Sequence, residues 1–460
     1  MRKGILGSLA VLTVGAGLSF GQGFGPPAGP GGPGGMLQSP DGHPIISPPG
    51  FEGAVPHSSM GNGPGGAYGS GDGIFGGGGR GASRTWASFD FLLWQTKSFQ
   101  YDYPLVTTSA PGDLGVVNGV TTSGLGTDKN ITFGSANGLR ATVGMAMDES
   151  GATGCELSGF LLESRAKRAE FTSNSLGFPL IAVPFSDTAA GNVQGSYIVS
   201  FPGINQGGAR IDARTRAWGA ELNAIWNAGG ENGGFSFLAG FRYLSLEEQL
   251  GIETQSSPFG VPPVGAGSTF FPGGGGFFGG AAIGGFAPFT VSTSDRIRTF
   301  NDFFGLNVGF RGDMNFGRCG VQVTGKLAGG YVRQQVDITG FSMLTGAAAS
   351  NTTVGGLFNS AQDIGRVRKD RWALMPECGV NLTYEVTTNL KAVFGYNFLY
   401  IYRVVRPTPI TTSVFNTTQI PVSPTFTGGS PPDGSFIKRD VLNQSDIWLQ
   451  GVNFGFQFSF

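Results

Sequence analysis

Residues 445–460 read SDIWLQGVNFGFQFSF, and this stretch at the end of the chain decides the fold. Its large apolar side chains occupy alternate positions, and small or polar residues lie between them. A period of two is typical of a strand and not of a helix. Such a strand suits a barrel that has lipid outside and a polar interior. The apolar positions are Trp448, Val452, Phe454, Phe456, Phe458 and Phe460, and Gln450 is the polar residue among them.

The same stretch resembles the C-terminal sorting signal of bacterial outer-membrane barrels, in which a polar residue, a glycine and two aromatic residues recur at fixed spacing. The resemblance implies that the barrel-assembly machinery recognises the last strand during insertion. The alternative is an edge strand of a soluble β sandwich, but so many exposed Phe side chains on a soluble edge strand would favour aggregation. The matching residues are Asn453, Gly455, Phe458 and Phe460.

The composition indicates strands joined by irregular loops. The 460 residues include 82 glycines, 12% aromatic and 13% charged residues, and the formal net charge is −1. This balance is poor in helix formers and offers no basic surface for nucleic acid, so no nucleic-acid partner is expected. The only histidines are His43 and His57. We therefore expect no metal, no other cofactor and no histidine-dependent protease or lipase, and we predict that the chain is not an enzyme.

The N-terminus predicts export. Arg2 and Lys3 precede an uncharged, largely apolar run over 4–20, as in a secretory signal peptide over 1–21 that is cleaved near Gly21. Residues 22–83 are dominated by Gly and Pro and cannot bury enough apolar surface to fold. They predict a disordered periplasmic tail, which is either a plain spacer or a tether or plug.

From residue 84 onward, alternating segments of about 10–15 residues have the length of tilted membrane strands. Short connections alternate with long ones, as in a barrel with short periplasmic turns and long outer loops. We predict an all-β fold over 84–460: a transmembrane antiparallel up-and-down β-barrel of about ten strands, or twelve if residues 195–201 form half of an extra hairpin. The ten segments are 86–96, 138–147, 154–165, 216–226, 234–248, 301–312, 319–338, 372–385, 389–404 and 446–460.

Two features of these segments need interpretation. In the segment 86–96, both faces carry large apolar residues, so its inward face is ambiguous. One face has Asp90, Leu92 and Trp94, and the other has Phe89, Phe91 and Leu93. The three cysteines all fall within predicted strands. An odd, sparse set describes no disulfide framework, so they are interpreted as small lipid-facing or packing residues. They are Cys155, Cys319 and Cys378.

Charged residues on the polar parity of the strands are expected to line the lumen. A charge facing lipid would cost about 2–4 kcal/mol at mid-depth. Both signs are present, so mutual pairing would largely fill a narrow lumen, and any pore of about ten to twelve strands is expected to be small. The residues are Arg140, Glu156, Glu221, Arg242, Arg311, Lys326 and Glu377.

Several segments resemble the beta-barrel porin-7 family of planctomycete outer-membrane proteins. The resemblance implies an outer-membrane barrel with a transport role and supplies no catalytic residues. The matching segments run in order through the chain: 103–108 (YPLVTT), 138–140 (GLR), 219–223 (GAELN), 239–244 (AGFRYL), 301–305 (NDFFG), 376–377 (PE), 405–407 (VRP) and 450–455 (QGVNFG).

Two functions fit this reading. The first is a passive, low-conductance porin for small solutes, in which inward charges and amides set selectivity. The second is a structural or adhesive surface protein whose barrel only anchors it in outer-membrane lipid. The Gly- and Phe-rich loop over 266–289 could fold inward as a constriction, lie outside as a contact surface, or be disordered with no specific partner. Whether the lumen is open distinguishes the two functions.

Overall fold

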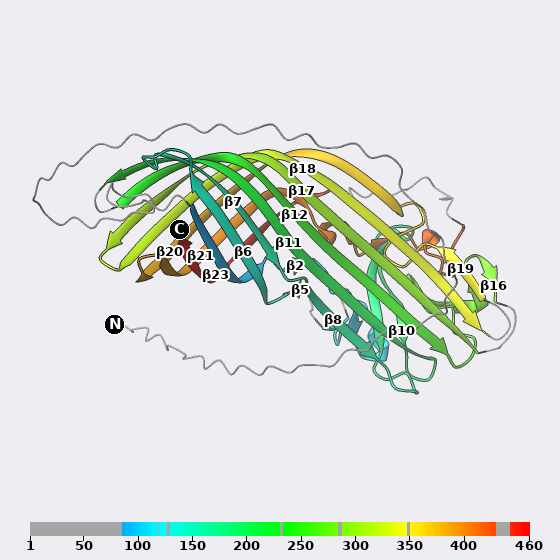
Figure 1. The fold of residues 1–460 in the computed structure, drawn as a ribbon. Coiled ribbons are helices and arrows are strands. Elements are labelled where there is room, and N and C mark those ends of the chain that lie inside the picture. The colour runs from blue at the N-terminus through cyan, green and yellow to red at the C-terminus, as the bar shows by residue number, and fades with distance from the viewer. Residues whose placement is uncertain are drawn as a thin grey trace, which may run out of the picture. The chain divides into compact units, whose positions relative to one another are not determined.

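A computed structural model describes residues 85–117, 119–126, 129–230, 233–283, 288–346, 350–428 and 442–460. The predicted signal peptide and Gly/Pro-rich tail lie outside the described residues. The antiparallel barrel is confirmed: each of its strands pairs with two neighbours, and the last pairs with the first (Figure 1). The ten strands are β1 (Thr85–Thr96), β6 (Ser135–Ala146), β7 (Thr153–Leu162), β11 (Asn205–Gly230), β12 (Gly233–Pro258), β17 (Phe289–Phe316), β18 (Cys319–Gly346), β20 (Gly365–Thr387), β21 (Leu390–Val405) and β23 (Gln444–Ser459).

The two ends of the barrel differ. At one end, which we call the turn end, strands are joined by short connections at 147–152, 317–318 and 388–389. The first and last strands also meet there, because the Phe460 N–H donates to the Thr85 carbonyl at 2.9 Å. The long connections lie at the opposite end, the loop end. Within the described residues, no helix is long and apolar enough to cross a membrane.

Strand β12 shows how the two faces of the wall are organised. Near the turn end, Phe237 and Phe241 point outward and are each 47% exposed. Arg242, on the opposite face of the strand, points inward and is buried. Toward the loop end the pattern inverts: Leu246 faces inward and is buried, and Glu247 faces outward. The outward aromatic surface suits lipid, and the polar wall beyond it suits water.

This inversion explains where the predicted strand bounds were wrong. Strands β11, β12, β17 and β18 continue past the hydrophobic part of the wall, through residues that the alternation assigned to loops. There the apolar residues face inward, so the pattern expected of a membrane strand is lost although the strand continues. Two shorter strands, β8 (Arg165–Thr172) and β19 (Ser350–Val354), pair with β11 and β18 in the same region.

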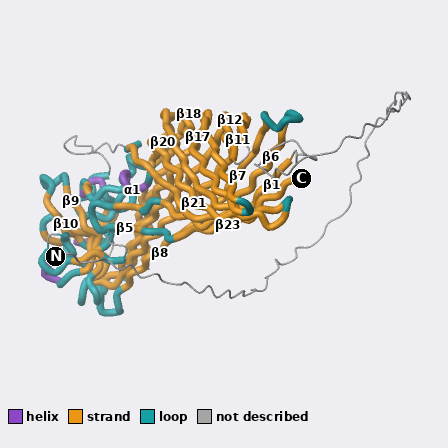
Figure 2. Tube along the Cα trace, turned by 90° about the vertical axis from the view of Figure 1, so that its left-hand side faces the viewer, coloured by secondary structure: helices purple, strands orange, loops and turns teal. Residues whose placement is uncertain are grey.

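A second sheet packs on the inner face of these extensions, and we call the two together the cap (Figure 2). Ile211 and Ile252 from the extensions share one buried apolar core with Phe185 and Tyr197 from the second sheet. The hairpin suggested by residues 195–201 exists, but it belongs to this sheet, so the barrel has ten strands and not twelve. The sheet contains β3 (Thr107–Thr108), β4 (Ser123–Gly124), β9 (Ile181–Asp187), β10 (Val193–Ser200), β13 (Gly265–Ala266), β14 (Thr269–Phe270) and β22 (Val414–Phe415).

The remaining elements of the long connections are short. They are the strand pairs β2 (Phe99–Gln100) with β5 (Asn130–Ile131) and β15 (Phe277–Phe278) with β16 (Ala281–Ala282), the helix α1 (Pro407–Ile410), and 3₁₀ turns at Pro111–Asp113, Gly274–Gly276 and Thr417–Gln419.

The Gly- and Phe-rich loop packs into the cap core. Phe270, Phe271 and Phe278 are buried, whereas Phe277 is 46% exposed. The Phe270 ring lies 5.4 Å from that of Tyr197. None of the predicted alternatives, a lumen constriction, an outer contact surface or a disordered loop, describes the buried rings: Phe270 and Phe278 belong to the cap core, and Phe271 belongs to a neighbouring buried cluster. Phe286 lies outside the described residues.

The cysteines lie in barrel strands, as predicted, and are not joined in disulfides: Cys155 in β7 is partly exposed, and Cys319 in β18 and Cys378 in β20 are exposed. Gln450 on the outward face accepts a hydrogen bond from the Tyr396 hydroxyl at 2.9 Å. This hydrogen bond gives a partner to the amide oxygen of the one polar residue that the final strand places among aromatic residues.

Candidate functional site: the barrel interior

Eight of the barrel strands each contribute one charged side chain to the lining of a central cavity, and we call this group the ion layer. It brings together all seven residues that the strand parity assigned to the lumen and adds an eighth. Four members are acidic and four are basic, so their formal charges cancel. The ion layer consists of Asp90 (β1), Arg140 (β6), Glu156 (β7), Glu221 (β11), Arg242 (β12), Arg311 (β17), Lys326 (β18) and Glu377 (β20).

Glu221 is bound by two cations at once. Arg242 Nε donates to Glu221 Oε2 at 2.8 Å, and Lys326 Nζ donates to the other carboxylate oxygen. Arg242 also donates through Nη2 to Glu377. The side chains of Glu221, Arg242 and Lys326 are only 9%, 7% and 7% exposed. Charges this deeply buried are tolerated only when they are paired, so these four residues depend on one another.

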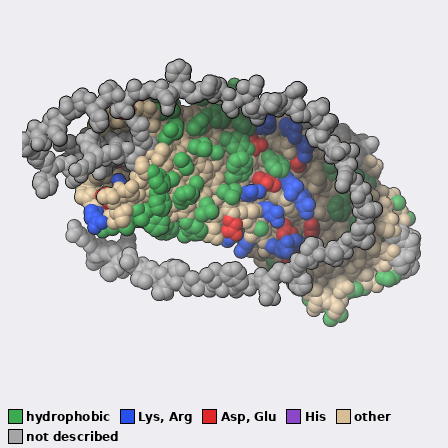
Figure 3. Space-filling model, in the orientation of Figure 1, with side chains coloured by type: hydrophobic (Ala, Val, Ile, Leu, Met, Phe, Trp, Pro, Cys, Tyr) green, Lys and Arg blue, Asp and Glu red, His purple; other side chains and the backbone are tan. Residues whose placement is uncertain are grey.

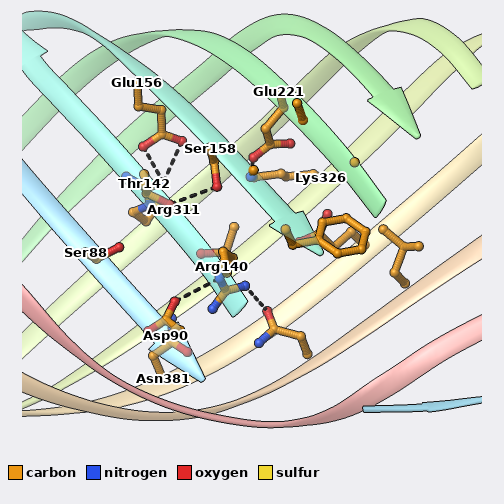
Figure 4. A pocket seen from close by; sticks show the side chains of 18 of the residues that line it. Ser88, Asp90, Arg140, Thr142, Glu156, Ser158, Glu221, Arg311, Lys326 and Asn381 are labelled. Carbon is orange, nitrogen blue, oxygen red and sulfur yellow. Dashed lines mark hydrogen bonds and ion pairs between the residues drawn. The ribbon is translucent and has the colours of Figure 1, made fainter. Parts of the chain in front are cut away.

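Two further ion pairs complete the layer (Figure 4). Arg311 Nη2 donates to both carboxylate oxygens of Glu156, at 2.9 and 2.8 Å. Arg140 Nε donates to Asp90 Oδ2 at 2.8 Å, and its Nη1 donates to Asn397 Oδ1 at 3.3 Å. Every member of the ion layer therefore has a partner of opposite charge.

Asp90 is the member that sequence reasoning missed. Both parities of its strand carry large apolar residues, so the alternation did not reveal which face points inward. The register places Asp90 directly opposite Arg140. Its position as the only charged residue between Trp86 and Thr96 was the available signal.

A second layer, formed by buried apolar side chains, lies on the loop side of the ion layer, and we call it the apolar layer. Leu92 follows Asp90 by two residues and Leu244 follows Arg242 by two, so the layers are adjacent. Phe160 packs against it, its ring 5.4 Å from that of Trp94. The apolar layer consists of Leu92, Trp94, Leu162, Ala217, Leu244, Leu246, Phe303, Ala328, Val332, Ala373, Met375, Leu399, Ile401, Val404, Ile447 and Leu449.

A cavity of about 130 Å³ remains among the ion-layer side chains. Hydroxyl groups of Ser88, Thr142 and Ser158 line it, and Trp94 and Leu244 of the apolar layer bound it. A polar space of this size holds a few water molecules. Within the described residues, no group of three or more His, Cys, Asp or Glu side chains is arranged to hold a metal ion.

Comparison with known proteins gives one family match. The sequence model described as "Putative beta barrel porin-7" matches residues 86–271 and 281–460. Among curated protein sequences, none matches the chain.

Solved outer-membrane structures show weak likenesses. The outer membrane protease OmpT from Escherichia coli aligns with a TM-score of 0.34 at 11% identity, over 82% of this chain and 97% of that chain. A Pseudomonas aeruginosa FadL homologue aligns with a TM-score of 0.24 at 6% identity, over 82% and 90%. The translocator domain of the autotransporter NalP from Neisseria meningitidis gives 0.21 at 9% identity, over 83% and 90%. Scores this low carry no functional argument.

Proposed function

We propose that this chain, which belongs to the beta barrel porin-7 family of outer-membrane β-barrels, is a closed barrel that anchors the cap in the outer membrane and presents it to the outside. The observation that carries this proposal is the apolar layer. Nine of the ten barrel strands contribute side chains to one contiguous buried cluster across the interior. A hydrated solute would have to lose its water to enter such a layer, which is costly for polar and charged species.

The ion layer supports the same proposal. Its members neutralise one another, so little net charge is left to attract an ion from solution. Arg242, which an open pore would use for selectivity, is held by Glu221 and Glu377. The side chains also occupy the space that a solute would need, leaving the small cavity described above.

The cap offers a surface for contacts. Leu176 and Phe178 in the connection after β8, and Phe259 directly after β12, are 64%, 52% and 49% exposed. Backbone hydrogen bonds from Gly203 to Leu176 and from Phe259 to Ile204 hold these turns side by side. Exposed apolar groups gathered on a rigid surface are typical of contact sites. In an outer-membrane barrel the long connections face outward, so a structural or adhesive role at the cell surface follows.

The test is single-channel conductance of the full chain refolded into a planar bilayer. We expect no conductance steps from the native protein. A variant in which Phe303 and Leu449 of the apolar layer are both replaced by Ala should conduct, which shows that the assay detects a breached lumen. Resistance of both proteins to unfolding in detergent confirms that each is folded.

The second candidate is a passive, low-conductance porin for small solutes. The family description and the polar cavity favour it, and it requires the apolar layer to part. Stable steps from the native protein, with an ion selectivity that changes in Arg242→Ala, would support the porin and refute the closed anchor.

A further inference from the structure

The outward wall of the barrel contains an apolar groove of about 950 Å³ on strands β1, β6, β7, β11, β21 and β23. Its floor consists of Ala141, Gly159 and Ala220, which neighbour one another in register on three adjacent strands and whose small side chains leave the space open. Phe89 and Trp218 stand at its sides, 58% and 41% exposed. The groove therefore opens toward the hydrophobic surroundings of the wall and not toward the lumen.

Two cations lie above the groove on the same strand face. Arg214, Arg216, Trp218 and Ala220 alternate along β11, so all four point outward. With a rise of about 3.3 Å per residue, Arg216 lies roughly 13 Å from the groove floor toward the loop end. This is where the hydrophobic surface gives way to charged side chains (Figure 3).

Both guanidinium groups are available to a ligand. Arg214 and Arg216 are exposed, and within the described chain neither forms an ion pair with a carboxylate. The registered neighbours of Arg214 are Ala166 and Gln249, which carry no charge. Arg216 has Glu247 opposite it in register, without an ion pair between them.

We infer that this groove and the two arginines form a binding site for one lipid with an anionic, phosphate-bearing headgroup. An acyl chain would fill the groove, and the phosphate would accept hydrogen bonds from Arg214 and Arg216, since guanidinium groups match phosphate oxygens well. Basic residues next to a membrane surface favour anionic lipids. A second copy of the chain is a poorer occupant, because a symmetric interface would bring the same cations toward each other.

The experiment is native mass spectrometry of the full chain extracted from nanodiscs that contain equal amounts of phosphatidylglycerol and phosphatidylcholine with identical acyl chains. We expect the native protein to retain phosphatidylglycerol in preference to phosphatidylcholine. Replacing both Arg214 and Arg216 by Gln should lower this preference by roughly thirtyfold, the scale for two cations at an anionic surface.

Two further variants separate the parts of the site. Gly159→Leu fills the groove: a Cβ there meets only the Gly219 carbonyl oxygen, at an ordinary 3.6 Å, so the variant should fold. It should lower retention of both lipids. Arg368→Gln is the matched control, because Arg368 is an exposed arginine on β20, away from the groove, whose Nε donates to Gln335. It should behave as the native protein.

Retention of both lipids in equal amounts by the native protein would overturn the headgroup assignment. An unchanged preference in the double arginine variant would do the same. Dimers that lose their interface in Gly159→Leu would assign the groove to a second copy instead. These readings are independent of whether the lumen conducts.

Discussion

Arg406 and Glu248 form a fully buried ion pair where the barrel meets the cap, with side-chain exposures of 3% and 0%. Arg406 Nε lies 2.9 Å from Glu248 Oε2, and Nη2 lies 2.8 Å from Oε1. Arg406 Nη1 also donates to the carbonyl of Ser98 at 3.1 Å, and Nη2 donates to the carbonyl of Lys97 at 2.9 Å. One side chain thus ties together the connection after β1, the strand β12 and the connection after β21.

The surroundings of this pair are apolar. The guanidinium carbon of Arg406 lies 5.1 Å from the centre of the Phe99 ring. Burial raises the pKa of the nearby Tyr101 hydroxyl well above its ordinary value. Tyr101 therefore stays neutral, and the charge of Glu248 is balanced by Arg406.

Replacing Arg406 by Met should destabilise the protein by about 3–5 kcal/mol, because the Glu248 carboxylate would be left buried without its partner. The free energy of unfolding in guanidinium and the protease resistance of the cap both measure this. The control is Arg366→Met, since Arg366 pairs with Asp337 but is 57% exposed; its loss should stay below about 1 kcal/mol. Equal losses in the two variants would show that the buried pair does not fasten the cap.

Replacing Glu221 by Gln should also cost about 3–5 kcal/mol, because it leaves Arg242 and Lys326 with one carboxylate fewer in a buried layer. Adding Lys326→Met should restore part of the loss, which a double-mutant cycle measures. Glu163→Gln, at a carboxylate that is 49% exposed beside Arg165, is the control and should change little. If adding Lys326→Met restored nothing, the two residues would not be energetically coupled.

An arginine on the outward wall tests where the hydrophobic surface ends. Leu222→Arg on β11, at a side chain that is 55% exposed, should lower the free energy of unfolding from a bilayer by about 2–4 kcal/mol. Gln255→Arg, on the exposed face of β12 near the loop end, should be close to neutral. Similar costs at both positions would mean that lipid covers the strand extensions as well.

The cap core depends on the Gly- and Phe-rich loop. Phe270 is 3% exposed, and Phe270→Ala should destabilise the cap by about 3–5 kcal/mol through the cavity it leaves. Phe277→Ala, at a side chain 46% exposed, should change stability by less than about 0.5 kcal/mol. Limited proteolysis of the two variants, followed by mass spectrometry, compares them. Equal protection would place the loop outside the core.

The barrel could be predicted from sequence because alternation is a local signal: the spacing of Phe454, Phe456 and Phe458 identifies the outward face of the last strand within five residues. The same signal pointed the charged residues inward, and the register then determined their partners. The apolar layer was not predicted, because Leu244 and Leu246 on the inward parity look like exceptions to a polar lumen. The pair of Arg406 with Glu248 joins residues 158 apart in the chain, so no local pattern reveals it.

The seam between β1 and β23 has a consequence for assembly. Lys97 and Asp446, which form an ion pair at 2.9 Å across this seam, are 349 residues apart in the chain. Bringing such distant segments together is the slowest kind of contact to form. The barrel therefore cannot close until its final strand has been delivered. A chain cut short before β23 would form an open sheet with two edges, whose unpaired N–H and C=O groups favour aggregation. Closure of the barrel therefore distinguishes chains that include the final strand from chains that lack it.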